Sequence, residues 1–206
     1  MAVLQLPYRG KIRFTSPYGD RLMNGQTSWH NGIDLVGQDE KTVRAPCAGR
    51  VAVSTMIPRE TDLTRTWEWG NYIRIDTDDG MRVYLCHLSE RLVSAGKTVS
   101  AGQPVGVEGD TGYTFGAHLH FEVRRGEAAV NPCPLLGIEN RAGVTLEGAP
   151  IAAPTWYDEA AKWAVDAGIL KGTGNGLALD EPCTRAMMVT FLHRFWAYIK
   201  SEAITK

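Results

Sequence analysis

The sequence contains no long hydrophobic run and no excess of charge of either sign. Its 206 residues are 44% hydrophobic and 22% charged, and no stretch approaches the roughly 20 apolar residues of a membrane-spanning helix. We therefore expect no membrane span. The formal net charge is −1, and Lys and Arg are scattered along the chain, so the basic face that binds nucleic-acid phosphates is missing. Nucleic acid is excluded as an expected partner.

Cysteine is also scarce, and its spacing excludes several kinds of site. No two cysteines form the C-x-x-C pair of zinc knuckles and thiol redox motifs. The residues at the N-terminus alternate polar and apolar side chains and do not form a signal peptide. Because disulfides are rare in a reducing cytoplasm, we expect free, buried thiols. The cysteines are Cys47, Cys86, Cys133 and Cys183.

Between about residues 8 and 125, short runs of alternating apolar residues are broken by Gly, Asp, Asn and Pro. This pattern is typical of an antiparallel β-domain. A D-G pair at Asp79 and Gly80 favours a tight hairpin turn between two of the expected strands. The expected strands are residues 12–16, 50–55, 71–77, 81–88 and 118–124.

After the β-domain the composition changes twice. Residues 126–155 collect proline and glycine, which break regular elements, and we interpret the later part as a linker. Residues 157–168 and 185–200 show helical spacing of apolar side chains. The expected fold class is α+β, mainly β. The predicted domains are residues 1–137, a linker at 138–153, and a small all-α helical module at 154–206.

The chain has five histidines, and four of them lie in the expected β-domain. Strand alternation puts His118, His120 and Glu122 on one face. His30 and Asp34 offer a ring nitrogen and a carboxylate at positions i and i+4. Two nitrogens and one carboxylate oxygen form a common catalytic zinc set that leaves a fourth position for water. Each motif alone occurs often by chance, and a strand histidine is more often structural, but the conjunction with the glycine-rich run before His118 favours a metal site.

Several motifs occur together between about residues 16 and 136. They are SPYGDR (16–21), HNGIDL (30–35), APCAGRV (45–51), GNYIRID (70–76), HLS (87–89), GQPVGVEGDTG (102–112) and HLHFEVR (118–124). With them the chain resembles the M23 family of zinc metallopeptidases, the lysostaphin-like or LytM-like peptidoglycan endopeptidases. The resemblance implies an antiparallel β-sheet domain of split-barrel or jelly-roll type that acts on bacterial peptidoglycan.

The resemblance also implies the roles of the histidines. One Zn²⁺ per chain is expected to be bound by His30, Asp34 and His120. His87 and His118 are the expected catalytic residues, acting beside the metal on the attacking water and on the developing oxyanion. The chemistry is intelligible from the residues themselves, since zinc lowers the pKa of water that it binds and a neutral imidazole can accept and return a proton.

The expected groove wall departs from the family pattern. Tyr113 and Thr114, followed by Phe115, stand where relatives often have small residues, and Leu85 stands where relatives often have Tyr. These changes concern substrate preference rather than the metal. The expected substrate-binding residues are Asn71, Tyr113 and Thr114.

An insertion at residues 57–69 contains two tryptophans near its end. We expect it to form a loop beside the groove. Trp67 and Trp69 either anchor this loop in the core or contact substrate, and the anchoring role is favoured.

Residues 154–200 resemble a single S-layer homology (SLH) module, with Trp156, AGILKG (167–172) and TRAMMVTFL (184–192) as the matching features. The resemblance implies binding to a secondary cell-wall polymer or to peptidoglycan. Arg185 and Trp156 are the candidate contacts, because a guanidinium pairs bidentately with a carboxylate or phosphate; a helix cap or a salt bridge is the alternative role of Arg185. A lone module could bind alone, form a homo-oligomer, or cap the enzyme.

These observations favour a zinc-dependent peptidoglycan endopeptidase. The alternative is a catalytically silent M23-fold module that binds the wall or activates another hydrolase. Degenerate members usually lack metal ligands or flanking histidines, and here all five positions are filled. Without an apparent signal peptide, we expect a phage-type endolysin held in the cytoplasm until release through a holin-type pore; an autolysin secreted with a leader since removed is the other route.

Overall fold

The computed structural model describes residues 4–23, 25–62, 64–150, 163–164, 167, 169 and 185–204. The contacts divide the chain into two compact units, Met1–Ile151 and Ala152–Lys206, which are described separately. Within the described residues, no helix has both the length and the hydropathy needed to cross a membrane.

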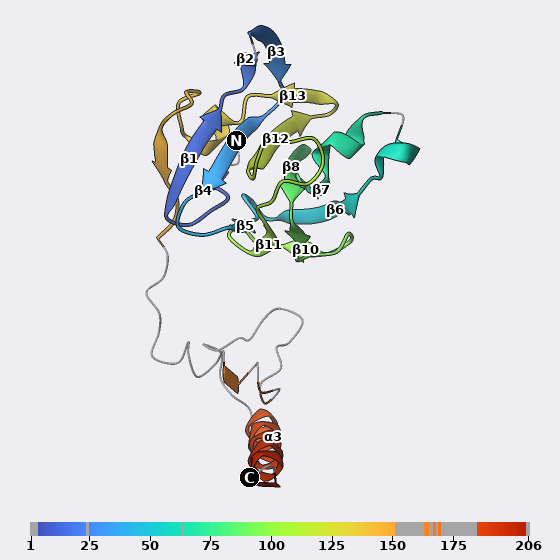
Figure 1. Ribbon diagram of the computed structural model, residues 1–206, viewed down its shortest axis with the longest axis vertical. Coiled ribbons are helices and arrows are strands. Elements are labelled where there is room, and N and C mark those ends of the chain that lie inside the picture. The colour runs from blue at the N-terminus through green and yellow to red at the C-terminus, as the bar shows by residue number, and fades with distance from the viewer. Residues whose placement is uncertain are drawn as a thin grey trace. The chain divides into compact units, whose positions relative to one another are not determined.

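An antiparallel sheet forms the framework of the first unit (Figure 1). Its strands are β1 (Lys11–Ser16), β4 (Ile33–Gly37), β6 (Gly49–Met56), β7 (Asn71–Asp76), β8 (Met81–Leu88), β10 (Thr98–Val99), β12 (Leu119–Arg125), β13 (Ala128–Val130) and β14 (Thr145–Glu147). The strand order is β10-β6-β7-β8-β12-β4-β1-β14, and β13 pairs with β12. The prediction of a mainly antiparallel β-domain is confirmed.

The alternating sequence pattern explains the sheet. All five predicted strands occur, as β1, β6, β7, β8 and β12, and the D-G turn joins β7 to β8 with Gly80 at φ +82°. One face of β12 supplies Leu119, Phe121 and Val123 to a fully buried core. Three of the cysteines, Cys47, Cys86 and Cys133, are free and buried as predicted, and Cys183 lies outside the described residues.

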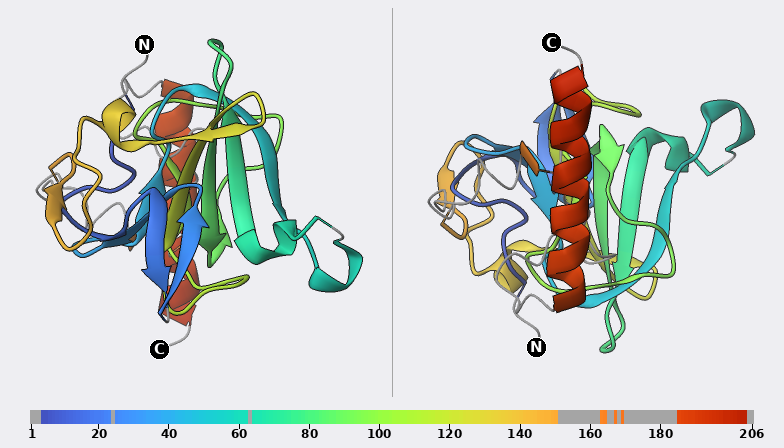
Figure 2. Two further views of the ribbon diagram at one scale, coloured as in Figure 1. Left: turned by 90° about the horizontal axis from the view of Figure 1, so that it is seen from above. Right: turned by 90° about the horizontal axis from the view of Figure 1, so that it is seen from below.

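The first unit also contains two smaller sheets and two short 3₁₀ helices. The hairpin of β2 (Gly19–Met23) and β3 (Gln26–His30) stands apart from the main sheet, and β5 (Thr42–Arg44), β11 (Pro104–Val107) and β9 (Glu90–Arg91) form a three-stranded sheet. The insertion between β6 and β7 contains η1 (Arg59–Thr61) and η2 (Thr66–Trp69). Figure 2 shows this insertion projecting beyond the ends of the strands that it joins.

The segment predicted as a linker, residues 138–153, contains a strand of the main sheet. A short helix, α1 (Cys133–Leu136), is followed by strand β14, which pairs with β1 at the edge of the sheet. Leu146 packs against the core, and Gly148 donates its backbone N–H to the carbonyl of Gly10 at 2.8 Å. The glycine and proline content around this three-residue strand hides it from a pattern analysis. Residues 138–150 thus pack on the β-domain.

The second unit contains one long described helix, α3 (Arg185–Ile204), which begins where the sequence predicts a helix and extends beyond residue 200. The ring of Trp163 meets those of Phe195 and Tyr198 edge-on, at centroid distances of 6.3 and 5.6 Å. Most of the predicted helix at 157–168 and the candidate contact Trp156 lie outside the described residues. Arg185 is the first residue of α3, and its side chain also lies outside the description.

Candidate metal centre

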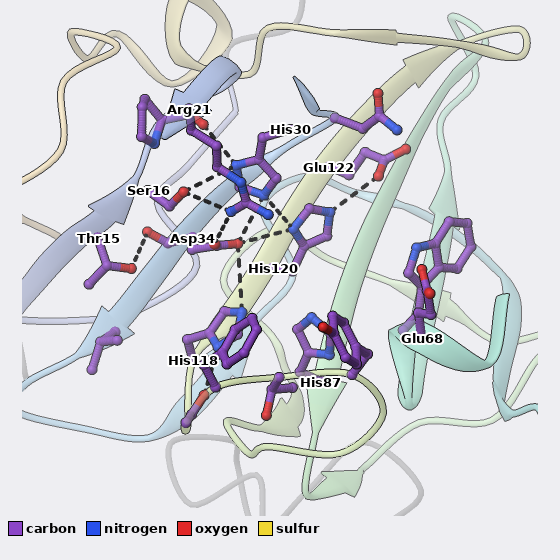
Figure 3. A pocket seen from close by; sticks show the side chains of 18 of the residues that line it. Thr15, Ser16, Arg21, His30, Asp34, Glu68, His87, His118, His120 and Glu122 are labelled. Carbon is purple, nitrogen blue, oxygen red and sulfur yellow. Dashed lines mark hydrogen bonds and ion pairs between the residues drawn. The ribbon is translucent and has the colours of Figure 1, made fainter. Parts of the chain in front are cut away.

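Three neighbouring strands and the β2–β3 hairpin bring four histidines and Asp34 together (Figure 3). Strand β12 lies between β8 and β4, so that His120 of β12 is the direct cross-strand partner of Asp34 on β4. His87 belongs to β8, and His118 immediately precedes β12. His30 ends the β2–β3 hairpin, just before β4 begins. Antiparallel pairing therefore places residues that are distant in the sequence at one point.

Ligand-type atoms of three residues converge at this point. Nδ1 of His120 lies 3.0 Å from Oδ1 of Asp34 and 3.0 Å from Nε2 of His30. Nε2 of His30 lies 3.2 Å from the same carboxylate oxygen. All three residues are buried, and their ligand atoms lie within 4.8 Å of one another. Two imidazole nitrogens and one carboxylate oxygen are a donor set that suits zinc.

In His30 and His120, the ring nitrogen that points away from the centre has a hydrogen-bond partner. Nδ1 of His30 lies 2.7 Å from the backbone carbonyl of Pro17, so this nitrogen carries the proton and Nε2 faces the centre unprotonated. Nε2 of His120 lies 3.2 Å from Oε2 of Glu122. In metal-binding histidines, the ring nitrogen that does not bind the metal usually donates a hydrogen bond to a carbonyl or carboxylate in this way. The arrangement of these two rings therefore fits a metal ion.

Gly32, between His30 and Asp34, occupies a position that has no room for a side chain. A Cβ atom on Gly32 would lie 2.5 Å from the backbone oxygen of Phe121 and 2.8 Å from Cε1 of His120. The backbone of the H-x-x-x-D segment thus passes directly against the ring of the other histidine. Only glycine allows this approach without displacing that ring.

The side chain of Arg21 holds the carboxylate of Asp34. Its Oδ2 accepts a hydrogen bond from Nη1 of Arg21 at 3.1 Å, and the same Nη1 donates to Oγ of Ser16 at 2.8 Å. Burial disfavours the carboxylate, but its contacts with the rings of His120 and His30 outweigh burial and hold the pKa of Asp34 well below its usual value. Asp34 is thus an anion at neutral pH.

The pKa of His120 is shifted upward. Burial lowers it, but hydrogen bonds to Asp34 and Glu122 outweigh burial and raise the pKa to about 9. The surroundings of this ring therefore favour a positive charge beside two carboxylates. A bound divalent cation supplies positive charge to the same place, which is a second reason that the residues fit a metal.

His87 and His118 flank the three ligand-type residues. Nδ1 of His87 lies 2.9 Å from the carbonyl oxygen of Thr111, and Nδ1 of His118 lies 2.7 Å from that of Gly116. Both rings therefore donate through Nδ1, which in a neutral ring leaves Nε2 without a proton. Nε2 of His118 lies 3.7 Å from Oδ1 of Asp34. Burial, together with His120 and His118, lowers the pKa of His87 to about 3, so this imidazole is neutral at pH 7.

The backbone of His87 is also unusual. Its φ is +65°, a left-handed conformation that costs energy in a residue with a Cβ atom. His87 lies near the end of β8, and the centroid of its ring is 4.7 Å from that of His118. Such strain is often found in residues of functional sites.

These residues lie in a groove of about 1010 Å³. Trp29 and Leu22 of the β2–β3 hairpin line it, as do Trp69 from the insertion and Tyr113 and Phe115 from the loop before His118. The insertion and this loop are tied together: the backbone N–H of Tyr113 donates to the carbonyl of Glu68 at 2.9 Å, and the ring of Tyr113 meets that of Trp67 edge-on at 6.4 Å. Trp69 packs against the rings of Tyr72 and Tyr84 in a small core cluster, as the favoured anchoring role predicts, and it also lines the groove.

The structure brings together seven of the eight residues predicted in the β-domain. His30, Asp34, His87, His118, His120, Tyr113 and Thr114 all line the groove. Asn71 does not line it, and its Oδ1 instead accepts a hydrogen bond from Nε of Arg91 at 3.1 Å.

Sequence reasoning assigned no role to Arg21 or Glu122, although both contact ligand-type residues. The signal for Arg21 was the SPYGDR motif, and the signal for Glu122 was its place on the histidine face of the strand.

Comparisons with known proteins agree with this geometry. Residues 28–132 match the model of Peptidase family M23, and residues 150–187 match that of the S-layer homology domain. The DD-carboxypeptidase/endopeptidase Mpg of Neisseria meningitidis is 32% identical over 122 residues, which are 58% of this chain and 26% of that protein. The murein hydrolase activator EnvC of Escherichia coli is 31% identical over 121 residues, with the same two coverages.

A solved structure shares the fold. The zinc-containing peptidase from Vibrio cholerae aligns with a TM-score of 0.50 and 29% identity, covering 62% of this chain and 37% of that one. The chain spans about a quarter of the length of the curated relatives that it matches first. The M23 match at residues 28–132 contains the three ligand-type residues and both flanking histidines.

Proposed function

Because the chain belongs to peptidase family M23 and carries a C-terminal S-layer homology domain, we propose that it is a zinc-dependent endopeptidase that cuts peptide bonds of bacterial peptidoglycan. The observation that carries the proposal is the convergence of His30, Asp34 and His120 beside two further histidines in one groove. Mpg, named as an endopeptidase, supports the reaction class, and the solved peptidase from Vibrio cholerae supports zinc.

The three converging residues would bind one Zn²⁺ ion through Nε2 of His30, Nδ1 of His120 and a carboxylate oxygen of Asp34. When bound, zinc supplies Lewis-acid chemistry, which lowers the pKa of coordinated water and polarises a carbonyl group. The carboxylate of Asp34 carries the only negative charge of this ligand set, and Arg21 orients it.

His87 and His118 supply the proton transfers in this proposal. In the neutral form each ring presents an unprotonated Nε2, because its Nδ1–H is held by a backbone carbonyl. An unprotonated Nε2 accepts a proton from the attacking water. The N–H that forms then donates to the tetrahedral oxyanion or to the leaving amine.

The groove suits an extended peptide. Tyr113 and Thr114 line it and are our proposed substrate contacts, and Trp69 is a further lining residue. Residues 154–206 are our proposed wall-binding module, because S-layer homology domains bind cell-wall polymers. Arg185 and Trp156 remain its predicted contacts, and action at the bacterial cell surface follows from the module. The prediction of an endolysin or autolysin stays a prediction.

The second candidate function is that of a catalytically silent M23 domain that activates another hydrolase. It is supported by the murein hydrolase activator among the relatives. The described site favours activity, since the three ligand-type residues and both flanking histidines are present with free nitrogens directed inward. An activator needs neither a metal nor these proton-transfer groups.

The test measures metal content and cleavage of purified peptidoglycan on the full chain. We expect one zinc per chain and new amine ends, with product masses that identify the bond. Both should be lost in His120→Ala, and chelation should abolish cleavage. His193→Ala, which removes the histidine of α3, is the matched control and should keep both.

Two other outcomes are informative. Zinc binding without cleavage of any wall type would favour the activator. A wild-type chain that takes up no zinc would contradict the proposal.

A further inference from the structure

Glu122 is a buried carboxylate whose two oxygens point in different directions (Figure 3). It lies on β12, two residues after His120, and only 1% of its surface is exposed. Oε2 lies 3.2 Å from Nε2 of His120, while Oε1 accepts a hydrogen bond from Nε of Arg124. Because residues i, i+2 and i+4 of a strand share one face, three consecutive side chains on that face form a linear chain of contacts.

Arg124 is itself held from the other side. Its guanidinium carbon lies 5.4 Å from the ring centroid of Trp69 and 5.2 Å from that of Tyr84. The two rings meet edge-on at 5.1 Å. Cations are stabilised over aromatic faces at such distances. The aromatic pair thus fixes the arginine, and the arginine supplies the charge that a buried carboxylate requires.

We propose that Glu122, fixed by Arg124, is the positioning residue of His120. A carboxylate accepts hydrogen bonds only, so Glu122 requires a proton on Nε2 of His120. With a proton on Nε2, Nδ1 is the nitrogen left available to a metal ion, and it lies 3.0 Å from both Oδ1 of Asp34 and Nε2 of His30. The inference rests on the proposed function, because it concerns how the zinc ligand is oriented.

The two ligand histidines are fixed by different means. His30 is held mainly by a backbone carbonyl, since its Nδ1 lies 2.7 Å from the oxygen of Pro17 and 3.4 Å from Oγ of Ser16. His120 is held by a side chain, that of Glu122. The orientation of His120 therefore depends on a side chain, whereas that of His30 depends mainly on the backbone.

Trp69 extends the contacts of Glu122 to the substrate groove. It ends η2 of the insertion, lines the groove, and contacts Arg124. Arg124 connects Trp69 to Glu122, so the wall that faces substrate and the side chain that orients a metal ligand belong to one network. The role of Glu122 is nevertheless tested without substrate, through the metal.

The experiment measures the zinc affinity of the full chain by competition with a chromogenic chelator. We expect Glu122→Ala to weaken zinc binding by about 10- to 100-fold, the usual effect of losing a partner of a ligand histidine. Glu122→Gln should weaken it less, because the amide oxygen still accepts the N–H but carries no charge. Glu147→Gln, on the exposed face of β14, is the matched control and should bind zinc like the wild type.

A spectroscopic measurement separates positioning from loss of fold. In the zinc-loaded wild type, the ring proton on Nε2 of His120 should exchange slowly and appear downfield in ¹⁵N-correlated NMR spectra. In Glu122→Ala this signal should be lost while the backbone amide spectrum of the sheet is kept. If Glu122→Ala does not fold, Glu122→Gln and Arg124→Gln carry the test, each with reduced zinc affinity as the expected result.

The outcomes distinguish the inference from its premise. A wild-type chain without zinc binding contradicts the proposed function. Tight zinc binding by the wild type, with the same affinity and the same His120 signal in the folded Glu122 variants, leaves the enzyme in place and overturns the positioning role.

Discussion

Arg21 and Asp34 join the β2–β3 hairpin to the sheet, with Nη1 of the arginine 3.1 Å from Oδ2 of the carboxylate. The bond reaches the carboxylate oxygen that does not face the two histidines, since Oδ1 is the atom close to His30 and His120. One oxygen is thus left for a metal while the other is fixed. The hairpin therefore contributes to the metal centre as well as to the groove wall.

Arg21→Gln should weaken zinc binding by about tenfold or more, because the carboxylate of Asp34 loses the cation that orients it. The measurement is chelator competition on the purified chain, with peptidoglycan cleavage followed in parallel. Arg50→Gln, an exposed arginine of β6, is the control. An unchanged zinc affinity in the Arg21 variant would show that Asp34 is held well enough by the strand alone.

Gly32→Ala should damage the metal centre without touching any ligand. The new Cβ would collide with the oxygen of Phe121 and the ring of His120, so either the ring or the β4 strand must move. We expect lower zinc affinity and a lower unfolding temperature. Gly80→Ala is the comparison, since Gly80 has a positive φ but open space around it. It should lose about 1 kcal/mol of stability and keep its zinc affinity. Equal zinc affinities in both variants would contradict the steric argument.

The strands of the main sheet could be predicted from the sequence because their signals are local. Alternating side chains and a D-G turn predicted β7 and β8 nearly to the residue. Strand β14 escaped prediction because it is three residues long, and its pairing with β1 joins segments far apart in the sequence. Short edge strands depend on tertiary contacts that a local pattern does not contain.

The ligand-type residues could also be predicted, but their supporting contacts could not. His30, Asp34 and His120 stand in recognisable motifs. Backbone carbonyls that hold a ring nitrogen, such as that of Pro17, leave no trace in residue identity. Likewise, the place of Trp29 in the groove wall depends on the tertiary position of the β2–β3 hairpin, which a local pattern does not contain.

Tyr8 and Glu108 should prove important for stability. Glu108 has a buried carboxylate that accepts from Tyr8 Oη at 2.7 Å, from the backbone N–H of Gly37 at 2.8 Å and from Nζ of Lys41 at 2.6 Å. Glu108→Ala leaves these donors without a partner and should cost about 2–4 kcal/mol. Tyr8→Phe removes one donor and should cost about 1–2 kcal/mol.

Denaturant unfolding of the wild type, the two single variants and the double variant measures the interaction free energy between Tyr8 and Glu108. Because the residues share one hydrogen bond, their costs should not add. Glu139→Ala, an exposed position, is the control and should stay close to the wild type. Full additivity would show that the bond contributes nothing of its own.

Glu40 should make the stability of the β-domain depend on pH. Its Oε1 accepts from the backbone N–H of Arg9 at 2.8 Å, and both of its oxygens pair with Arg44. Burial raises the pKa of Glu40, but the hydrogen bonds with Arg44 and Arg9 outweigh burial and lower it. A folded-state pKa below the unfolded value, about 4.3, means that folding favours the ionised form.

The sign of the effect follows from this linkage. The stabilisation by Glu40 is fully present above the unfolded pKa and is lost as the pH falls through the lower, folded pKa. Glu40→Gln should therefore be less stable than the wild type at pH 7, by up to about 1 kcal/mol for a pair near the surface. The difference should shrink steadily below about pH 4. Unfolding free energies of both proteins across the acid range measure it, with Glu147→Gln as the control. A difference that stayed constant or grew on acidification would contradict an ionic role for Glu40 and would leave only the packing of its side chain.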